Sequence, residues 1–245
     1  MESQICPICD GKVINNLTRQ KQYLWQICDY CNFVFLDINL PNEDINDVES
    51  SEQGNAYIKI YGNKYKAKMR RSMRRSRTIK RLMKGSRILD IGCNLGYFVE
   101  ACRVLGLESI GLEVNPIVVK KAKSIFPLCH FTCGFLGDTD IGKEKFDAIY
   151  TSEVIEHVED VNDFMKNISS KLVSGGILYL TTPDIKGFIP KHTDGEWKKL
   201  LAPNHRLYFS RVNMKVFLEK HGFKDVKFKI NWNFKPGIKL TAIKI

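Results

Sequence analysis

Four cysteines in the first part of the sequence form two close pairs in the spacing C-x2-C-x18-C-x2-C, namely Cys6, Cys9, Cys28 and Cys31. Each pair can present two thiolates from one tight turn, and four thiolates fill the tetrahedral coordination shell of Zn²⁺. Such a filled shell leaves no open position for a reacting molecule. The spacing therefore predicts a structural zinc site, and the alternative is four reduced thiols without a metal.

Two carboxylates and an imidazole occur together in the middle of the chain, as Glu153, Glu156 and His157. If this segment is helical, the three side chains share one face at i, i+3 and i+4. Such a face can hold a hard divalent ion such as Mg²⁺, with His205 as a fourth ligand. Without an ion, His157 or His205 can act as a general base, because an imidazole titrates near neutrality. These four residues form the candidate catalytic set in either case.

A glycine turn is the third candidate, in residues 87–99, which read RILDIGCNLGYFV. A short apolar run contains Asp90 and ends at Gly92, and Gly96 closes the turn before a helical pattern begins. Glycine suits such a turn because it adopts positive φ angles and lets a ligand approach the backbone. Asn94 stands where a third glycine is usual, and asparagine tolerates the left-handed conformation. With Glu113 at the next strand end, the turn predicts a nucleotide-type cofactor; NAD is the alternative for the turn taken alone.

The elements that must position these residues alternate between strand and helix from residue 86 onward. We expect strands at 88–91, 109–113, 130–133, 146–151 and 177–181, helices at 97–105, 116–124, 161–172 and 210–220, and two further strands at 224–230 and 239–245 around a turn at 235–237. This pattern predicts an α/β fold with a Rossmann-like, doubly wound, seven-stranded sheet. The sheet is expected to be largely parallel, to end in an antiparallel carboxyl-terminal hairpin and to follow a small zinc ribbon. Ligands bind beyond the carboxyl ends of such strands.

Composition divides the chain into three parts: a zinc-ribbon module at 1–36, an acidic linker at 37–56 and the α/β domain at 57–245. A long basic amphipathic helix is expected at 64–87. This helix can bind the phosphates of a nucleic acid, a nucleotide-linked substrate or a lipid headgroup, or it can be the solvated face of a packed helix. The net charge of +11 fits both interpretations.

The sequence carries no sign of a membrane or a secretory route. No apolar run approaches the roughly 20 residues that a membrane span needs. The first residues lack the basic and apolar regions of a signal peptide. We therefore expect a cytoplasmic protein whose eight cysteines are reduced.

Five stretches in a fixed order carry a resemblance to a known family: 88–98 (ILDIGCNLGYF), 111–116 (GLEVNP), 146–160 (FDAIYTSEVIEHVED), 175–183 (GGILYLTTP) and 204–210 (NHRLYFS). With them the sequence resembles the class I S-adenosylmethionine-dependent methyltransferases over residues 57–245. Within that superfamily it looks most like the branch that contains ubiquinone-biosynthesis O-methyltransferases and many sugar methyltransferases. The zinc ribbon lies outside this match.

The resemblance implies S-adenosylmethionine as the cofactor, with residues 134–138 beside the adenine and Glu113 accepting hydrogen bonds from the ribose hydroxyls. The cofactor-binding residues that it implies are Asp90, Gly92, Cys93, Asn94, Gly96, Tyr97, Phe98, Glu113, Val114, Leu136, Ser152 and Glu153. The E-x-x-E-H run resembles the metal-binding motif of ubiquinone-type O-methyltransferases and of small-RNA 3′-terminal 2′-O-methyltransferases. Residues 187–203 are expected to form a lid over the acceptor.

Three functions are compatible with these patterns. The first is a methyltransferase that acts on an oxygen of a small molecule, such as a sugar or a quinone-like acceptor. The alternative is an RNA methyltransferase that grips phosphates with the zinc ribbon and the basic helix. The third is a non-catalytic binding protein that keeps the cofactor fold, although the intact set of Asp90, Gly92, Gly96 and Glu113 argues against it. The sequence leaves the acceptor atom and the oligomeric state open.

Overall fold

The structure is a computed structural model, and it describes residues 5–12, 14–37, 50–62, 64–142, 145–187, 200, 202–229 and 237–245. Most of the expected acidic linker, most of the expected lid at 187–203 and part of the turn at 235–237 therefore lie outside the described residues. The chain divides into two compact units. The ribbon unit comprises Met1–Ile45, Glu153–Lys166 and Leu180–Ala242, and the sheet unit comprises Asn46–Ser152, Asn167–Tyr179 and Ile243–Ile245.

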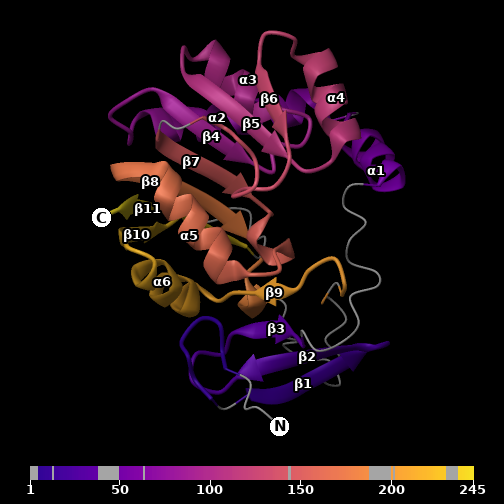
Figure 1. Cartoon of the computed structure of the whole chain (residues 1–245), viewed down its shortest axis with the longest axis vertical. Helices are drawn as coiled ribbons and strands as arrows, with labels where there is room; N and C mark the ends of the chain where they lie inside the picture. The colour runs from indigo at the N-terminus through magenta and orange to yellow at the C-terminus, as the bar shows by residue number, and fades with distance from the viewer. Residues whose placement is uncertain are drawn as a thin grey trace. The chain divides into compact units, whose positions relative to one another are not determined.

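Seven strands form one sheet in the order β10-β11-β8-β7-β4-β5-β6 (Figure 1). They are β4 (Arg87–Ile91), β5 (Glu108–Glu113), β6 (His130–Cys133), β7 (Phe146–Ser152), β8 (Leu172–Thr182), β10 (Phe223–Phe228) and β11 (Ile238–Lys244). Strand β4 pairs in parallel with β5 and β7, and β5 pairs in parallel with β6. The predicted Rossmann-like, seven-stranded sheet is confirmed. Strand β8 begins earlier than the expected strand at 177–181, so the glycines at 175–176 lie inside it.

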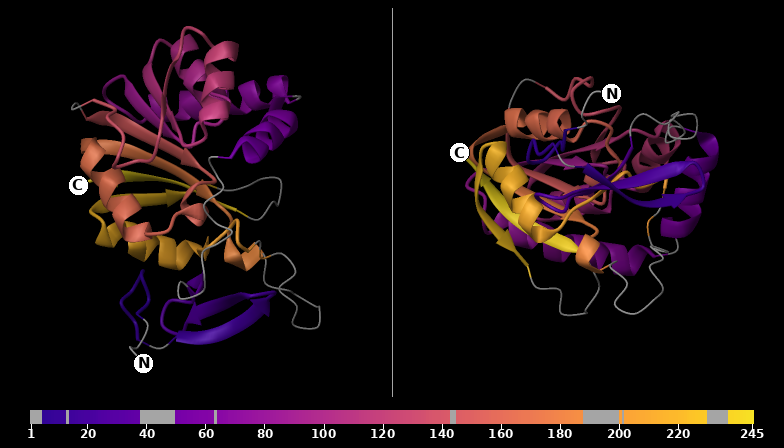
Figure 2. Two further views of the ribbon diagram at one scale, coloured as in Figure 1. Left: turned by 45° about the vertical axis from the view of Figure 1, so that its right-hand side comes forward. Right: turned by 90° about the horizontal axis from the view of Figure 1, so that it is seen from below.

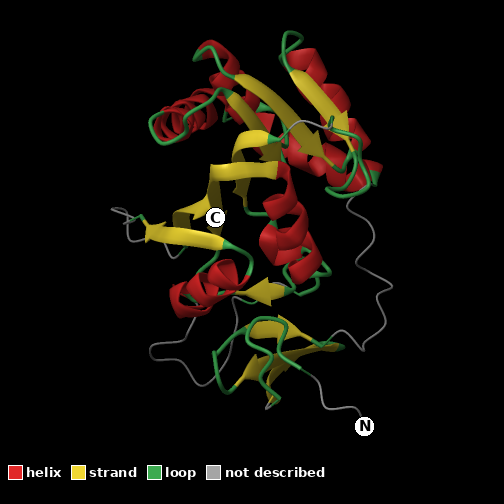
Figure 3. Cartoon of the chain, turned by 60° about the vertical axis from the view of Figure 1, so that its left-hand side comes forward, coloured by secondary structure: helices red, strands yellow, loops and turns green. Residues whose placement is uncertain are grey.

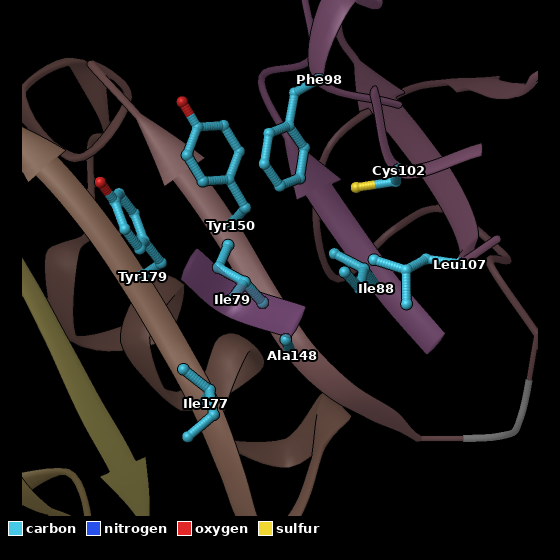
Figure 4. Close-up of a cluster of buried hydrophobic side chains, with 9 residues drawn as sticks. All are labelled: Ile79, Ile88, Phe98, Cys102, Leu107, Ala148, Tyr150, Ile177 and Tyr179. Atoms are coloured by element: carbon cyan, nitrogen blue, oxygen red, sulfur yellow. The ribbon is translucent and has the colours of Figure 1, made fainter. Parts of the chain in front are cut away.

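A buried hydrophobic core fixes helices α2 (Tyr65–Lys80) and α3 (Tyr97–Val104) within the sheet unit (Figure 4). Phe98 of α3 stacks on Tyr150 of β7, with the ring centroids 3.8 Å apart. Ile79 of α2 is fully buried in the same cluster. Burying a side chain of this size stabilises the fold by about 1.5–3 kcal/mol. On another side of the unit, α1 (Ser51–Gly62) lies beside α4 (Pro116–Ile125) (Figure 2).

The helix ends follow local sequence signals. Ser210 caps α6 (Arg211–Lys220), and Asn213 completes a capping box. The basic helix expected at 64–87 is too long, because α2 ends at Lys80 and Arg87 already belongs to β4. The backbone amide of Arg87 donates to Asp147 Oδ2 over 3.0 Å, which holds that residue in the sheet. No helix in the described part of the chain has the length and apolar character needed to cross a bilayer.

The ribbon unit contains a second sheet, with the strand order β1-β2-β3-β9 (labelled in Figure 1). Its strands are drawn in yellow in Figure 3. Its strands are β1 (Ile14–Gln20), β2 (Tyr23–Cys28), β3 (Val34–Leu36) and β9 (Leu207–Tyr208). All pairings in this sheet are antiparallel. The compact unit that holds the cysteine-rich strands thus includes a strand from far along the chain. The division into parts at 1–36, 37–56 and 57–245 stays a prediction.

Candidate functional site

The glycine turn follows β4, and three of its residues have positive φ angles: Gly92 (71°), Asn94 (51°) and Gly96 (78°). Asn94 therefore adopts the left-handed conformation that its residue type favours. The backbone amides of Gly92 and Cys93 donate to the carbonyl oxygen of Leu112 on β5, over 2.8 and 3.0 Å. These bonds fix the turn against the neighbouring strand, at the carboxyl end of the sheet, where ligands bind in folds of this class.

Two carboxyl groups converge at this turn. Glu113 accepts hydrogen bonds from two backbone amides, that of Asn94 on Oε2 over 2.9 Å and that of Asn115 on Oε1 over 3.2 Å. Burial raises the pKa of Glu113, and these amides oppose the rise. Asp90 is buried at the end of β4, and its pKa is raised well above the ordinary value, first by burial and then by Glu113, while Arg75 lowers it. The backbone donors hold Glu113 in a fixed orientation at the end of β5.

Arg75 of α2 reaches the same edge of the sheet, although the sequence patterns placed it only within the basic helix. Its Nη1 donates to the hydroxyl of Tyr150 and, over 3.1 Å, to Ser152 Oγ at the end of β7. Its Nε is buried and has no hydrogen-bond partner among the described residues. The signal was present in the sequence, because the small residues Ser72 and Ser76 mark the buried face of α2 on which Arg75 lies.

The other cofactor residues implied by the resemblance surround this turn or follow it. Cys93, Tyr97 and Phe98 are buried, Val114 and Ser152 are half-buried at the ends of β5 and β7, and Leu136 is half-buried in the loop after β6. Glu153 follows Ser152 in the chain but belongs to the ribbon unit. Within the sheet unit, the structure thus brings these residues to the carboxyl ends of neighbouring strands. Their roles in binding stay predictions.

A second candidate site lies within the ribbon unit and consists of Glu156, His157 and His205, here named the Glu-His-His cluster. One possible ligand atom from each residue lies within 4.8 Å of the others. The two imidazole rings meet edge to face, with their centroids 4.8 Å apart. His157 Nδ1 bonds to the carbonyl oxygen of Asn204, and His205 Nδ1 lies 3.1 Å from the hydroxyl of Tyr208. Both rings are therefore held through Nδ1, which leaves Nε2 to face a ligand.

The two carboxylates of the E-x-x-E-H run are held differently. Glu156 is fully buried; its Oε2 accepts a hydrogen bond from the Thr182 hydroxyl over 2.9 Å, and its Oε1 has no partner among the described residues. Glu153 Oε1 accepts a hydrogen bond from the Thr181 hydroxyl over 2.8 Å, and Glu153 is not part of the group of three. The condition of a helical segment is not met here, because Glu153 has a φ of 59° and only the 3-10 turn η2 (Ile155–His157) follows. A left-handed residue breaks the helical spacing, so a tight turn places these side chains.

Burial sets the protonation of the Glu-His-His cluster. The pKa of Glu156 is raised well above its ordinary value, first by burial and then by the charge of Glu153. Burial lowers the pKa of His157, and it lowers the pKa of His205 to about 4, with a further contribution from His157. At neutral pH both imidazoles are therefore neutral, which is the form that binds a metal or accepts a proton.

The four cysteines in the C-x2-C spacing come together in the ribbon unit, with their sulfur atoms within 4.8 Å of one another. Two of the sulfur–sulfur distances are 3.6 and 3.7 Å. Zn–S bonds of about 2.3 Å in a tetrahedron require sulfur atoms about 3.8 Å apart, so the four donors fit Zn²⁺. Each turn ends in a residue with positive φ, Asp10 (59°) or Asn32 (56°), whose amide donates to the carbonyl of the first cysteine of its pair. All eight cysteines lie among the described residues, and none of them forms a disulfide bond.

Comparison with known proteins shows the family to which the chain is related. A family model described as a methyltransferase domain matches residues 63–227. The ubiquinone biosynthesis O-methyltransferase of Nitrobacter winogradskyi is 33% identical over 168 residues, which cover 61% of this chain and 64% of the relative. The enzyme of that name from Bradyrhizobium diazoefficiens is 27% identical over 167 residues, which cover 60% of this chain and 65% of the relative. The chain thus spans less than two thirds of the length of these relatives.

The fold also has counterparts among solved structures. The crystal structure of a TehB-like S-adenosylmethionine-dependent methyltransferase from Corynebacterium glutamicum matches with a TM-score of 0.58 and 20% sequence identity. The match covers 79% of this chain and 99% of that chain. At this identity the likeness shows a shared Rossmann-like fold.

Proposed function

The chain belongs to the methyltransferase domain family, and from this premise we propose that it transfers the methyl group of S-adenosylmethionine to an oxygen of a small molecule. The observation that carries the proposal is the left-handed turn after β4, with Glu113 fixed beside it by two backbone amides. The relatives named as ubiquinone biosynthesis O-methyltransferases support oxygen as the acceptor atom and a quinone-like molecule as the acceptor. A sugar is the other small acceptor that the proposal includes. Methyl transfer requires the nucleophile, the methyl carbon and the sulfur in line, so positioning contributes most of the acceleration.

On the cofactor side, the turn at Gly92, Asn94 and Gly96 offers bare backbone to the adenosyl cofactor. Glu113 keeps two oxygen atoms at the strand end and can accept hydrogen bonds from the ribose hydroxyls. Arg75 presents a buried Nε without a hydrogen-bond partner among the described residues, which suits the carboxylate of the methionine part. The residues of this edge therefore match the chemical groups of S-adenosylmethionine.

On the acceptor side, the Glu-His-His cluster has the donor atoms for a divalent ion. Glu156 Oε1 has no hydrogen-bond partner in the described part of the chain, and each imidazole can offer its Nε2 atom as a ligand. Two imidazoles and one carboxylate fit Mn²⁺ or Zn²⁺ better than Mg²⁺, because Mg²⁺ prefers oxygen ligands. If these residues held such an ion, it would lower the pKa of an acceptor hydroxyl group bound to it. Without an ion, neutral His205 can take the proton of the acceptor hydroxyl.

We assign a structural role to the four cysteines, which would bind Zn²⁺ and keep the ribbon strands folded. Their reduced state fits a cytoplasmic protein. The basic face of α2 is the feature that would suit RNA, but the relatives are named for ubiquinone biosynthesis, and ubiquinone is a small molecule. RNA is therefore an outcome of the test below and not part of the proposal.

Calorimetric titration with S-adenosylhomocysteine tests the cofactor site. Glu113→Gln removes a charged acceptor, and because hydrogen bonds to charged groups contribute about 1.5–3 kcal/mol, we expect the affinity to fall about 10- to 150-fold. Glu108 at the opposite end of β5 is the matched control, since it is exposed and pairs only loosely with Arg87, 3.7 Å away. Glu108→Gln should leave the affinity within about twofold of the wild type. Equal losses in both variants would place the cofactor elsewhere.

Transfer of a labelled methyl group tests the reaction. The wild type, with and without Mn²⁺, is incubated with labelled S-adenosylmethionine and, in turn, hydroxylated quinone precursors, nucleotide-linked sugars and mixed RNA. Label in a small hydroxylated acceptor supports the proposal. Label only in RNA would favour the basic helix as the substrate surface. Tight cofactor binding with no transfer to any acceptor would favour a non-catalytic binding protein.

A further inference from the structure

The strand that follows His205 belongs to the ribbon sheet. Strand β9 pairs with β3, with Val34 opposite Tyr208 and Phe35 opposite Leu207. In the strand order, β9 lies at the edge with β3 as its neighbour. A strand of two residues is not stable by itself, so its pairing with β3 fixes the backbone that begins two residues after His205.

The backbone of Arg206 joins the ribbon to the Glu-His-His cluster. Its carbonyl oxygen accepts a hydrogen bond from the amide of Leu36 in β3 over 2.9 Å. Its own amide donates to the carbonyl oxygen of Glu156 over 2.7 Å. Arg206 is therefore bonded to a ribbon strand through one backbone group and to the residue with the buried carboxylate through the other.

Tyr208 provides a second link, through its side chain. Its ring is fully buried against Trp25 of β2, with the centroids 5.4 Å apart. Its hydroxyl lies 3.1 Å from His205 Nδ1. The hydrophobic core of the ribbon thus holds the hydroxyl group that orients the His205 ring.

Both cysteine turns are bonded to helices of the same unit. Asn213 Nδ2 donates to the carbonyl oxygen of Cys31 over 3.2 Å, and Asn162 Nδ2 donates to that of Pro7 over 2.9 Å. Asn213 is the buried member of the capping box of α6, and Asn162 lies in the first turn of α5 (Val161–Lys171). A metal ion held by the two turns would therefore fix the ribbon at both of these contacts.

We propose that zinc in the four-cysteine site keeps His205 in place, so that the ribbon is a scaffold of the Glu-His-His cluster. The inference rests on the proposed zinc site. It assigns the ribbon a role in positioning His205, and the proposed methyl transfer does not require that role. The cysteine-rich segment supplies only part of the core of its unit, so we expect it to depend on the metal for its stability. Once it unfolds, β9 loses its partner, and His205 loses the hydroxyl that orients it.

Amide hydrogen exchange of the full chain, followed by NMR, tests the scaffold. Cys9→Ser removes one of the four thiolates, and Cys133→Ser, at an exposed cysteine outside the group, is the matched control. Elemental analysis should find the same zinc content in the wild type and in the control, and about one zinc ion per chain less in Cys9→Ser. In Cys9→Ser we expect the amides of Leu36 and Arg206 to exchange at least tenfold faster. The amides of Gly92 and Cys93 in the sheet unit should keep their rates.

Unchanged exchange at Leu36 and Arg206 in a Cys9→Ser protein that has lost this zinc ion would overturn the inference. If the amides of Gly92 and Cys93 also exchange faster, the variant has unfolded as a whole. The Tyr208→Phe variant then tests whether the ribbon orients His205. This substitution keeps the ring against Trp25 and removes only the hydroxyl.

Tyr208→Phe should retain zinc and shift the ring nitrogen resonances of His205. It should also weaken Mn²⁺ binding about tenfold, since an outer-shell partner of a ligating histidine contributes about 10- to 100-fold to metal affinity. Ring resonances that stay in place would overturn the scaffold role. If the wild type binds zinc but no Mn²⁺, the proposed ion on the acceptor side is refuted. The amide exchange rates and the His205 ring resonances still test whether the ribbon positions His205.

Discussion

Replacing Gly96 by alanine adds one methyl group at the start of α3, where two different costs arise. Gly96 has a φ of 78°, and a Cβ atom there would lie 2.4 Å from the ring of Phe131. Gly106, just beyond the end of the same helix, has a φ of 70°, and its Cβ position has no heavy atom within 4 Å. Alanine is strained by the backbone at both positions but meets a ring at only one. The pair therefore isolates the effect of the close approach.

The expected magnitudes follow from these two terms. The left-handed conformation costs an L-residue about 1–2 kcal/mol, and this cost is common to both variants. Forcing a methyl group against a packed ring adds about 1–3 kcal/mol. We therefore expect Gly96→Ala to lower the free energy of unfolding by about 2–5 kcal/mol and Gly106→Ala by about 1–2 kcal/mol.

Urea denaturation of the wild type and both variants measures these losses directly. A double variant, Gly96→Ala with Phe131→Leu, should lose less than the sum of its single changes, because the smaller side chain leaves room for the methyl group. Gly96→Ala should also weaken the binding of S-adenosylhomocysteine, whereas Gly106→Ala should not. Equal losses of stability in the two alanine variants would refute the reasoning, because strain alone would then explain both.

Three further predictions concern the titratable groups and Arg75. Burial lowers the pKa of His205 to about 4, so the imidazole takes up a proton when the protein unfolds below about pH 6.5. The free energy of unfolding should therefore fall as the pH drops from about 6.5 towards 4. Urea titrations should show a smaller fall in His205→Gln. Burial raises the pKa of Glu156, so the charge of this carboxylate opposes folding at pH 7 in metal-free protein. Glu156→Gln should therefore keep or raise the melting temperature without metal and abolish any rise caused by Mn²⁺. A large fall of the melting temperature in the metal-free variant would contradict this. Arg75→Met should weaken S-adenosylhomocysteine binding about tenfold by calorimetry, whereas Arg74→Met, on the exposed face of α2, should not.

The sheet and the turn after β4 were predictable because their signals are local. Apolar runs, glycine positions and the acid at each strand end are read along the chain and need no distant partner. The left-handed Asn94 follows from the same logic, because the turn requires a residue that tolerates positive φ. The half-buried position of Arg75 was harder to predict, because the neighbouring arginines of the same helix are exposed and carry the same charge.

The ribbon unit was less predictable because its contacts join segments far apart in the sequence. No local pattern pairs β3 with the two residues Leu207–Tyr208, since a strand so short has no periodicity. The backbone at 153–157 was also not predictable, and a helix there was only a condition for side chains that share one face. Glu153 takes a positive φ that its residue type does not favour, and hydrogen bonds of its amide and carboxylate to Thr181 hold it there.

The pairing of β3 with β9 also constrains how a chain of this kind can evolve. Leu207, Tyr208 and Phe209 are buried, and Phe209 packs against Phe33 with the ring centroids 4.8 Å apart. A descendant that lost the cysteine-rich segment would expose these side chains on an unpaired strand edge, where they favour aggregation. Loss or gain of the ribbon therefore requires matching substitutions near position 208, and the two segments are expected to be inherited together.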